Sequence, residues 1–455
     1  MRRRSLLRSG FASLTACTSN TMMLGGLGLL NTARAMSSDT PTDYKTLVMV
    51  FLHGGVDSLA LLIPSDTASY SQYKNLRQHL ATPQEELLDL GVESIAAPEY
   101  CGGMVDLFQA KKLSWVSNIG PLKQPTTKSM IQNDERVMPY FVGAHNSQRI
   151  MWNSASVNPN AREGWGAKML ELMNLTNSVV TPNISLDRNQ LFTSTLTTPT
   201  FSVNPNEIEN LVNLDPAARG LDPDVDLFYR LQQAPRAGLL GQELANRNLR
   251  TLESSASLSQ VIESTNETSV SYPADDTLEG VAIQSQLKMA ARLIEAAPKL
   301  DHPRQVIMVR MNGYDTHDNQ DKILPKLLNS LFNALNAFQA DLEARGVDDR
   351  VVTFSQSDFG RTPTINANGT DHGWGGHNFL MGTPVKGGQI VGEIPEFGVE
   401  TDKMLYNLSI PDFSVEQYAS NLAKWFGLSG SQIAEVFPNL SRFDDVDFGL
   451  LPSAS

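Results

Sequence analysis

Four short apolar segments constrain the fold of this chain more than any other feature. The first, Leu47–Leu52, is almost continuously apolar, which is typical of a strand buried on both faces of a sheet. It ends in a glycine turn that carries a carboxylate, Asp57. Three further strands are predicted at residues 113–119, 306–311 and 351–354.

Helical patterns separate these strands. Apolar residues recur at helical spacing over residues 104–111, 278–297, 324–342 and 415–426. Gly346 and Gly427 follow two of these stretches as helix stops, and Ser414 with Gln417 forms a capping-box pattern before the last one. The alternation predicts an α/β fold: a doubly wound, mostly parallel sheet sandwiched by helices.

Residues 45–440 are predicted to form this α/β domain, followed by a tail at 441–455. Residues 176–275 differ from the rest because they are richer in Asn, Thr, Ser and Pro. We expect them to be an insertion or cap on the main sheet.

The first 35 residues resemble a twin-arginine export signal. Arg2–Arg4 precede a weakly apolar stretch, and Ala33–Ala35 has the small-residue pattern of a cleavage site. Gly, Ser and Thr dilute the apolar stretch, so no stable membrane span is expected. The signal predicts passage through the twin-arginine export machinery, cleavage near Ala35 and a periplasmic or secreted protein. Cys101 would then be the only cysteine, so no intramolecular disulfide is expected.

The charge balance bears on the kind of partner. The chain has 49 acidic and 36 basic residues, a formal net charge of −13. A nucleic-acid-binding protein would carry a basic footprint, so nucleic acid is not expected as a partner. An acidic chain can still bind a small anionic ester if a metal centre supplies local positive charge.

Acidic residues follow three of the four predicted strands: Asp57, Asp315 and Asp358. Ligands of open α/β sheets bind outside the carboxyl ends of the strands, where these residues would lie. Asp315 and His317 are two positions apart in an extended turn, so both side chains can face one side. A single acid after a strand is more often a helix cap or turn former, so the argument depends on the group.

The glycine-rich segment Gly369–His377 is the other concentration of ligand-type residues, with Asp371, His372 and His377. Carboxylates and imidazoles together bind zinc, manganese or iron, and this number of them would hold two divalent ions. Two ions about 3.5–4 Å apart can bind both the attacking and the leaving oxygen in ester hydrolysis. Arg361 could pair with a phosphate or sulfate oxygen.

The same segments resemble one known family. They match the exported bacterial family known as domain of unknown function 1501 (DUF1501), from about residue 45 to residue 440. This family is grouped with the alkaline phosphatase and sulfatase superfamily, which implies an α/β sandwich over two metal ions. The resemblance rests on residues 51–58, 313–317, 357–362, 369–382 and 422–427.

The resemblance implies a ligand set. The superfamily's ligand positions match Asp57, Asp315, His317, Asp358 and His377. The superfamily often has His after the Asp358 position, where this chain has Phe359, so His372 would supply the missing imidazole. Asp371 is then either a ligand or a partner that orients His372.

The nucleophile is not evident. Many relatives have Ser where Ala144 stands, so Ser147, Ser58 or a water would have to substitute. His145 could be a general acid, a packing residue or a ligand. Cys101 is not in the context that sulfatases convert to formylglycine.

Two functions therefore remain open at this point. The first is an exported metal-dependent hydrolase of phosphate or sulfate esters, with two divalent ions, zinc or manganese. The alternative is an exported non-catalytic binding or assembly protein that retains the fold with a degenerate or structural metal site.

Overall fold

The computed structural model describes residues 41, 43–188, 190–206, 220, 222–234, 238–273 and 280–452. Residues 43–455 form one compact unit. The predicted export signal, residues 1–35, lies outside the described residues. None of the described helices is long and apolar enough to cross a membrane.

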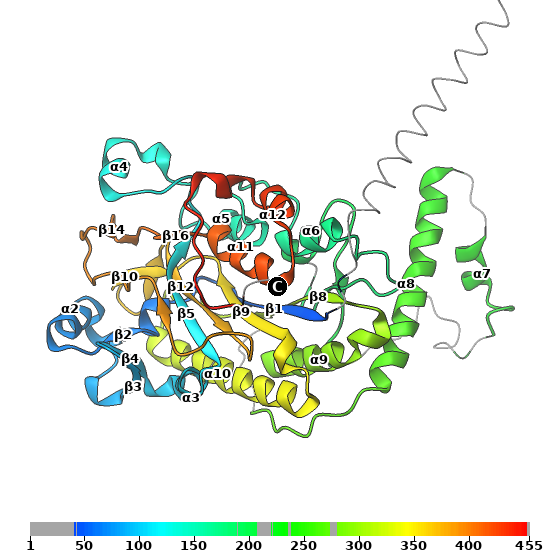
Figure 1. Ribbon diagram of the computed structural model, residues 1–455, viewed down its shortest axis with the longest axis horizontal. Helices are drawn as coiled ribbons and strands as arrows, with labels where there is room; N and C mark the ends of the chain where they lie inside the picture. The colour runs from blue at the N-terminus through cyan, green and yellow to red at the C-terminus, as the bar shows by residue number, and fades with distance from the viewer. Residues whose placement is uncertain are drawn as a thin grey trace, which may run out of the picture. The chain divides into compact units, whose positions relative to one another are not determined.

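A nine-stranded sheet forms the centre of the compact unit (Figure 1). Among the described strands of this sheet, β12 (Gly376–Met381) alone runs antiparallel to its neighbours, so the sheet is mostly parallel as predicted. The strand order is β13 (Ile390–Val391), β5 (Leu113–Gly120), β12 (Gly376–Met381), β9 (Val351–Ser357), β1 (Lys45–Leu52), β8 (Arg304–Met311), β6 (Asn183–Ser185) and β7 (Phe201–Ser202), and β16 (Phe413–Ser414) pairs with β5. The four predicted strands are β1, β5, β8 and β9.

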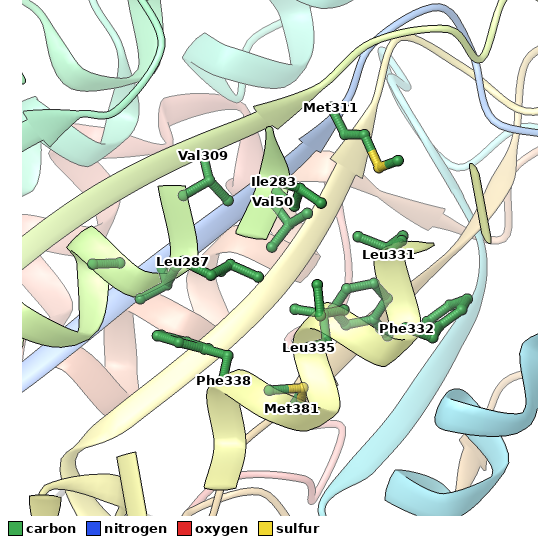
Figure 2. Packing of buried hydrophobic residues seen from close by; sticks show 14 of the residues in the cluster. Val50, Ile283, Leu287, Val309, Met311, Leu331, Phe332, Leu335, Phe338 and Met381 are labelled. Atoms are coloured by element: carbon green, nitrogen blue, oxygen red, sulfur yellow. The ribbon is translucent and has the colours of Figure 1, made fainter. Parts of the chain in front are cut away.

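Helices cover both faces of the sheet because successive residues of β1 point to opposite sides. Val48, Val50 and Leu52 pack in one core cluster with residues of α3, α9 and α10. Leu47, Met49 and Phe51 pack in the other with residues of α5, α6, α11 and α12. Figure 2 shows the first cluster, where α9 and α10 side chains meet those of the strands.

The four predicted helices are present, and two of them end at the predicted glycines, whereas the helix predicted at 104–111 spans 102–109 and the one predicted at 278–297 spans 283–296. α10 ends at Gly346 with φ +67°, and α11 has the Ser414–Gln417 capping box and ends at Gly427 with φ +108°. The helices are α2 (Thr67–Arg77), α3 (Gly102–Gln109), α4 (Lys128–Asn133), α5 (His145–Ser154), α6 (Trp165–Leu172), α7 (Leu227–Gln233), α8 (Leu239–Glu263), α9 (Ile283–Ala296), α10 (Gln320–Arg345), α11 (Val415–Phe426) and α12 (Gly430–Val436).

The stretch predicted as an insertion contributes to the main sheet. It supplies β6 and β7 at one edge, and Leu258 and Ile262 of α8 belong to the first core cluster. Outside the main sheet, the described residues form small sheets of β2 (Ile63–Pro64), β3 (Leu87–Val92) and β4 (Ile95–Pro98), of β10 (Arg361–Ile365) and β11 (Thr370–His372), and of β14 (Met404–Leu405) and β15 (Leu408–Ser409).

The glycine-rich segment is more regular than a loop. Its Asp371 and His372 lie on β11, which pairs antiparallel with β10, and the chain then enters β12. The glycines permit close backbone contact: a Cβ on Gly373 would lie 2.2 Å from the Gly360 carbonyl oxygen. This contact holds the β10–β11 ribbon against the segment that follows β9.

Candidate metal centre

Three imidazoles and one carboxylate converge beyond the carboxyl ends of the central strands. His145 is the first residue of α5, Asp315 and His317 follow β8, and His372 lies on β11. Ligand atoms of His145, Asp315 and His372 all lie within 4.8 Å of one another. These side chains come from three distant parts of the chain.

The Nε2 atoms of the three rings face one another. The His372 Nε2 atom lies 3.0 Å from that of His145 and 2.8 Å from that of His317. The Asp315 carboxylate lies beside all three, with Oδ1 3.2 Å from His317 Nε2 and 3.3 Å from His372 Nε2, and Oδ2 3.4 Å from His145 Nε2.

The opposite ring nitrogens show where the ring protons lie. His145 Nδ1 is 2.6 Å from Asp358 Oδ2, and His372 Nδ1 is 2.7 Å from the Gly143 carbonyl oxygen. Because both partners only accept, each Nδ1 carries the hydrogen and each neutral ring has its Nε2 lone pair toward the centre. His317 Nδ1 lies 3.3 Å from Asp371 Oδ1.

This arrangement fits a divalent ion. Facing lone pairs 2.8–3.0 Å apart repel each other unless a proton or a cation lies between them. Histidines that bind metals generally donate their other ring N–H to a carboxylate or a backbone carbonyl, as His145 and His372 do. Three imidazole nitrogens and one carboxylate oxygen form a donor set suited to zinc.

Local backbone structure orients these side chains. Thr316 is buried and its hydroxyl bonds to Gln320 Oε1 at 3.0 Å, so Asp315 and His317 on either side of it face outward together. This matches the alternation predicted for the extended turn. Gly143, with φ +78°, precedes α5 and lets its carbonyl reach His372.

Electrostatics keep the centre rich in electron-pair donors. Burial alone would raise the pKa of Asp315, but the hydrogen bond and charge of Arg361 and the neighbouring imidazoles lower it below its ordinary value. Burial, together with the charge of Arg361, lowers the pKa of His372. A neutral imidazole and an ionised carboxylate are the forms that bind a metal ion.

The apolar ring of Phe359 packs against two of the imidazoles. Its buried ring lies 4.7 Å, between centroids, from the rings of both His145 and His372. At the position where the sequence resemblance implied a ligating histidine, this chain therefore packs a phenyl ring against His145 and His372.

Arg361 does not have the free guanidinium that the sequence suggested. Its buried N–H groups donate to the carbonyls of Gly54, Gly55, Tyr314 and Thr370, and to Asp315. With its donors used in this way, Arg361 orients the Asp315 carboxylate, and we assign it no contact with substrate.

Asp57 and Asp358 differ from the ligands that the sequence suggested. Both carboxylates are fully buried. Both oxygens of Asp57 pair with the Arg77 guanidinium, and Gln320 Nε2 donates to Oδ2 at 2.6 Å. Asp358 accepts from His145. Asp57 is therefore neutralised by Arg77, and Asp358 orients a ring that faces the other imidazoles.

His377 and Ser58 are both buried and are hydrogen-bonded to each other. The Ser58 hydroxyl oxygen accepts from the His377 backbone N–H at 2.8 Å, and His377 Nδ1 accepts from the Asn118 N–H at 3.1 Å. Burial lowers the pKa of His377 to about 4, against the charge of Asp57. We place neither residue in the centre. Ser147, on the first turn of α5, is partly buried and stays a predicted nucleophile.

The sequence left the role of His145 open among three alternatives, and the structure places it in the centre. The available signal was its position: it begins a helix in the stretch of chain that leaves the carboxyl end of β5, the side of the sheet where the other candidates lie. Asp371, considered as a partner of His372, instead lies beside His317.

Several solved structures resemble this chain at 9–11% identity. The PsFucS1 sulfatase from Pseudoalteromonas sp. matches with a TM-score of 0.34 and 9% identity, over 94% of this chain and 75% of that chain. The lipoteichoic acid synthase LtaP from Listeria monocytogenes matches with a TM-score of 0.29 and 9% identity, over 82% of this chain and 79% of that one. The alkaline phosphatase PafA matches with a TM-score of 0.28 and 11% identity, over 71% of this chain and 64% of that one.

At these scores the likenesses carry no conclusion about what this chain binds. No curated protein sequence matches it. A family model does match, over residues 44–437, and it agrees with the resemblance found in the motifs. The chain therefore belongs to the family described as "Protein of unknown function (DUF1501)".

Proposed function

We propose that this protein is an exported, metal-dependent hydrolase of phosphate or sulfate esters. The observation that supports the proposal best is the convergence of three imidazole Nε2 atoms, 2.8 and 3.0 Å apart, beside the Asp315 carboxylate. His145, His317, His372 and Asp315 would hold one divalent ion, with zinc favoured over manganese by the donor set.

One ion, instead of the two expected from the sequence, is the number that these contacts support. Arg77 already neutralises Asp57, Phe359 supplies no ligand atom, and the buried His377 lies against Asn118 and Ser58. His377 Nε2 and Asp358 Oδ1 are buried without a hydrogen-bond partner and are the atoms left for a second ion, so the metal content decides between one ion and two.

The ion would supply a Lewis acid that polarises an ester oxygen. The chain itself contributes orientation. Asp358 and the Gly143 carbonyl hold the rings of His145 and His372 through their Nδ1–H groups, and Arg361 holds Asp315. Phe359 excludes water from beneath the imidazoles, which strengthens the electrostatic interactions above it.

Metal content and hydrolysis test the proposal together. The purified protein is expected to bind close to one equivalent of zinc or manganese, and to hydrolyse an aryl phosphate or an aryl sulfate. His372→Ala should lose both the ion and the activity, whereas His79→Ala should keep both. Near two equivalents of metal would restore the two-ion site, and bound metal without turnover of either ester would contradict the hydrolase.

Two observations favour a second candidate, a non-catalytic binding protein with a structural ion. Ala144 offers no hydroxyl before α5, and Arg361 has its donors occupied within the protein. A structural ion would resist removal by a chelator and its loss would lower the melting temperature. A catalytic ion would exchange readily with little effect on melting.

A further inference from the structure

Arg149 is positioned beside the proposed metal centre. It lies on α5 four residues after His145, so both side chains emerge on the same face of the helix, one turn apart. Its guanidinium donates to Asn146 Oδ1 at 2.7 Å and is hydrogen-bonded to His53 Nε2. Both of these acceptors are neutral side-chain groups.

Other arginines around the strand ends differ from Arg149 in their partners. Arg77 pairs with Asp57, Arg361 pairs with Asp315, and Arg310 lies 2.7 Å from Asp187 Oδ2. Within the described part of the chain, no carboxylate pairs with Arg149. Its side chain is partly buried, so this positive charge lacks the compensation that its neighbours have.

The guanidinium of Arg149 also keeps donors available. Of its five N–H groups, the two described hydrogen bonds use two. Its Nε makes no described hydrogen bond and is not among the buried atoms that lack a partner, so this N–H is open to solvent. Each of the two Nη groups also keeps a second N–H. The planar arrangement of these donors suits two oxygens of a phosphate or sulfate group.

His53 holds Arg149 on the side of the metal centre. The backbone of His53 is fixed by two hydrogen bonds to the chain around the end of β8. Its backbone N–H donates to the Met311 carbonyl at 2.9 Å, and its carbonyl accepts from the backbone N–H of Tyr314, the residue before Asp315, at 3.2 Å. Burial lowers the pKa of the His53 ring, against the charge of Asp358 and together with that of Arg149. A neutral ring can accept from Arg149 without repelling it.

We propose that Arg149 binds the tetrahedral anionic group of the substrate, with His53 and Asn146 as positioning residues that aim its guanidinium. The inference rests on the proposed function, since it assigns a second contact for the ester whose oxygen would meet the ion. It names the ligand class as an oxyanion with at least two oxygens free for a planar, bidentate contact.

Binding of inorganic phosphate and sulfate tests this role apart from catalysis. Calorimetric titrations would use the full protein in two states, treated with a chelator and reconstituted with zinc. Arg149→Gln is expected to weaken binding roughly 10- to 100-fold in both states, the value of one or two hydrogen bonds to a charged group. Arg149→Lys should fall in between, because it keeps the charge and loses the bidentate contact.

Arg162→Gln is the matched control, because it removes the same charge from an exposed position in the chain between α5 and α6. Zinc content and melting temperature of each variant separate loss of anion binding from loss of the metal or of the fold. Unchanged phosphate and sulfate affinity in a folded Arg149→Gln protein would overturn the inference. Absence of binding by the wild-type protein in both states would also overturn it.

If the protein binds no metal, the proposed function fails, yet the chelator-treated titrations still decide whether Arg149 binds the anion. If metal binds and Arg149→Gln leaves both affinities intact, the inference fails and the metal centre stands. The two failures are therefore distinguishable.

Discussion

Asp57 and Asp315 occupy equivalent places in the sequence but different places in the electrostatics of the molecule. Each follows a central strand of the sheet, and each pairs with an arginine. Asp57 is fully buried, with Arg77 across both of its oxygens, whereas the Asp315 side chain is 48% exposed. Three imidazoles face Asp315.

The difference shows what decides the role of an acid at a strand end. The bidentate pairing and a Gln320 hydrogen bond satisfy Asp57, so it acts as a buried structural ion pair. Arg361 donates to one oxygen of Asp315, and its other hydrogen bonds go to backbone carbonyls. Asp315 can therefore still coordinate a cation. Both carboxylates follow the carboxyl end of a central strand. They differ in the number of protein hydrogen-bond donors that already occupy their oxygens.

The largest expected effect is on stability. Asp57→Ala would leave the buried Arg77 guanidinium without its counter-ion, and should lower the free energy of unfolding by about 3–5 kcal/mol. Urea denaturation measures the loss. The folded fraction should bind as much zinc as the wild-type protein.

A double variant sharpens this prediction. Asp57→Leu with Arg77→Met removes both charges, and should recover much of the stability lost by Asp57→Ala, because no unpaired charge stays buried. Loss of bound zinc in a folded Asp57 variant would show that Asp57 acts at the metal centre after all, and would break the comparison.

Asp315→Asn should show the opposite pattern. Because Asn can still accept from the buried Arg361, which also retains its backbone acceptors, stability should fall by about 1–3 kcal/mol, less than in Asp57→Ala. The affinity for zinc should fall roughly 100-fold or more, beyond the effect of changing a residue that only orients a ligand. Competition with a fluorescent zinc chelator measures this affinity. Unchanged zinc affinity would remove Asp315 from the centre.

The sequence predicted the scaffold well because its signals were local. The apolar run Leu47–Leu52, the capping box at Ser414 and the stop at Gly346 each depend on neighbours within a few positions, and each matches an element of the structure. Asp315 and His317 face one side because the extended backbone between them alternates, which is again a local rule.

Features that depend on distant partners were not predictable in this way. Arg77 reaches Asp57 from the last residue of α2, and no local pattern in either segment indicates that pairing. The direction of β12 depends on its pairing with β5 and β9. Arg361 resembled a substrate-binding arginine until its acceptors, contributed by three separate segments, were known.

A smaller effect is expected from the residues that orient the imidazoles. Asp358→Asn weakens the acceptor 2.6 Å from His145 Nδ1, and should lower zinc affinity about 10- to 100-fold. Asp371→Asn should cost less than about 10-fold, because Asp371 is 58% exposed and its oxygen lies 3.3 Å from His317. Equal losses, measured with the same chelator competition, would contradict this ranking.

The smallest expected effect concerns Glu416, a buried carboxyl on α11 that has no cation among its described partners. Asn439 Nδ2 donates to it at 3.0 Å, and burial raises its pKa to about 7. Between the ordinary pKa of 4.5 and about 7, the folded state keeps a proton that the unfolded state has lost. Stability should therefore fall as pH rises through this range, by about 1 kcal/mol between pH 6 and pH 8.

Glu416→Gln should remove this fall in stability, and Glu435→Gln, an exposed change on α12, should keep it. Urea denaturation at a series of pH values compares the wild-type protein with these two variants.

The result bears on the comparison with Asp57. Both carboxyls are buried, but Arg77 balances the charge of Asp57, whereas no arginine or lysine pairs with Glu416 in the described chain. If the free energy of unfolding of the wild-type protein does not change between pH 6 and pH 8, burial does not raise the pKa of Glu416. Burial could then not be the reason that Asp57 needs Arg77 as a counter-ion.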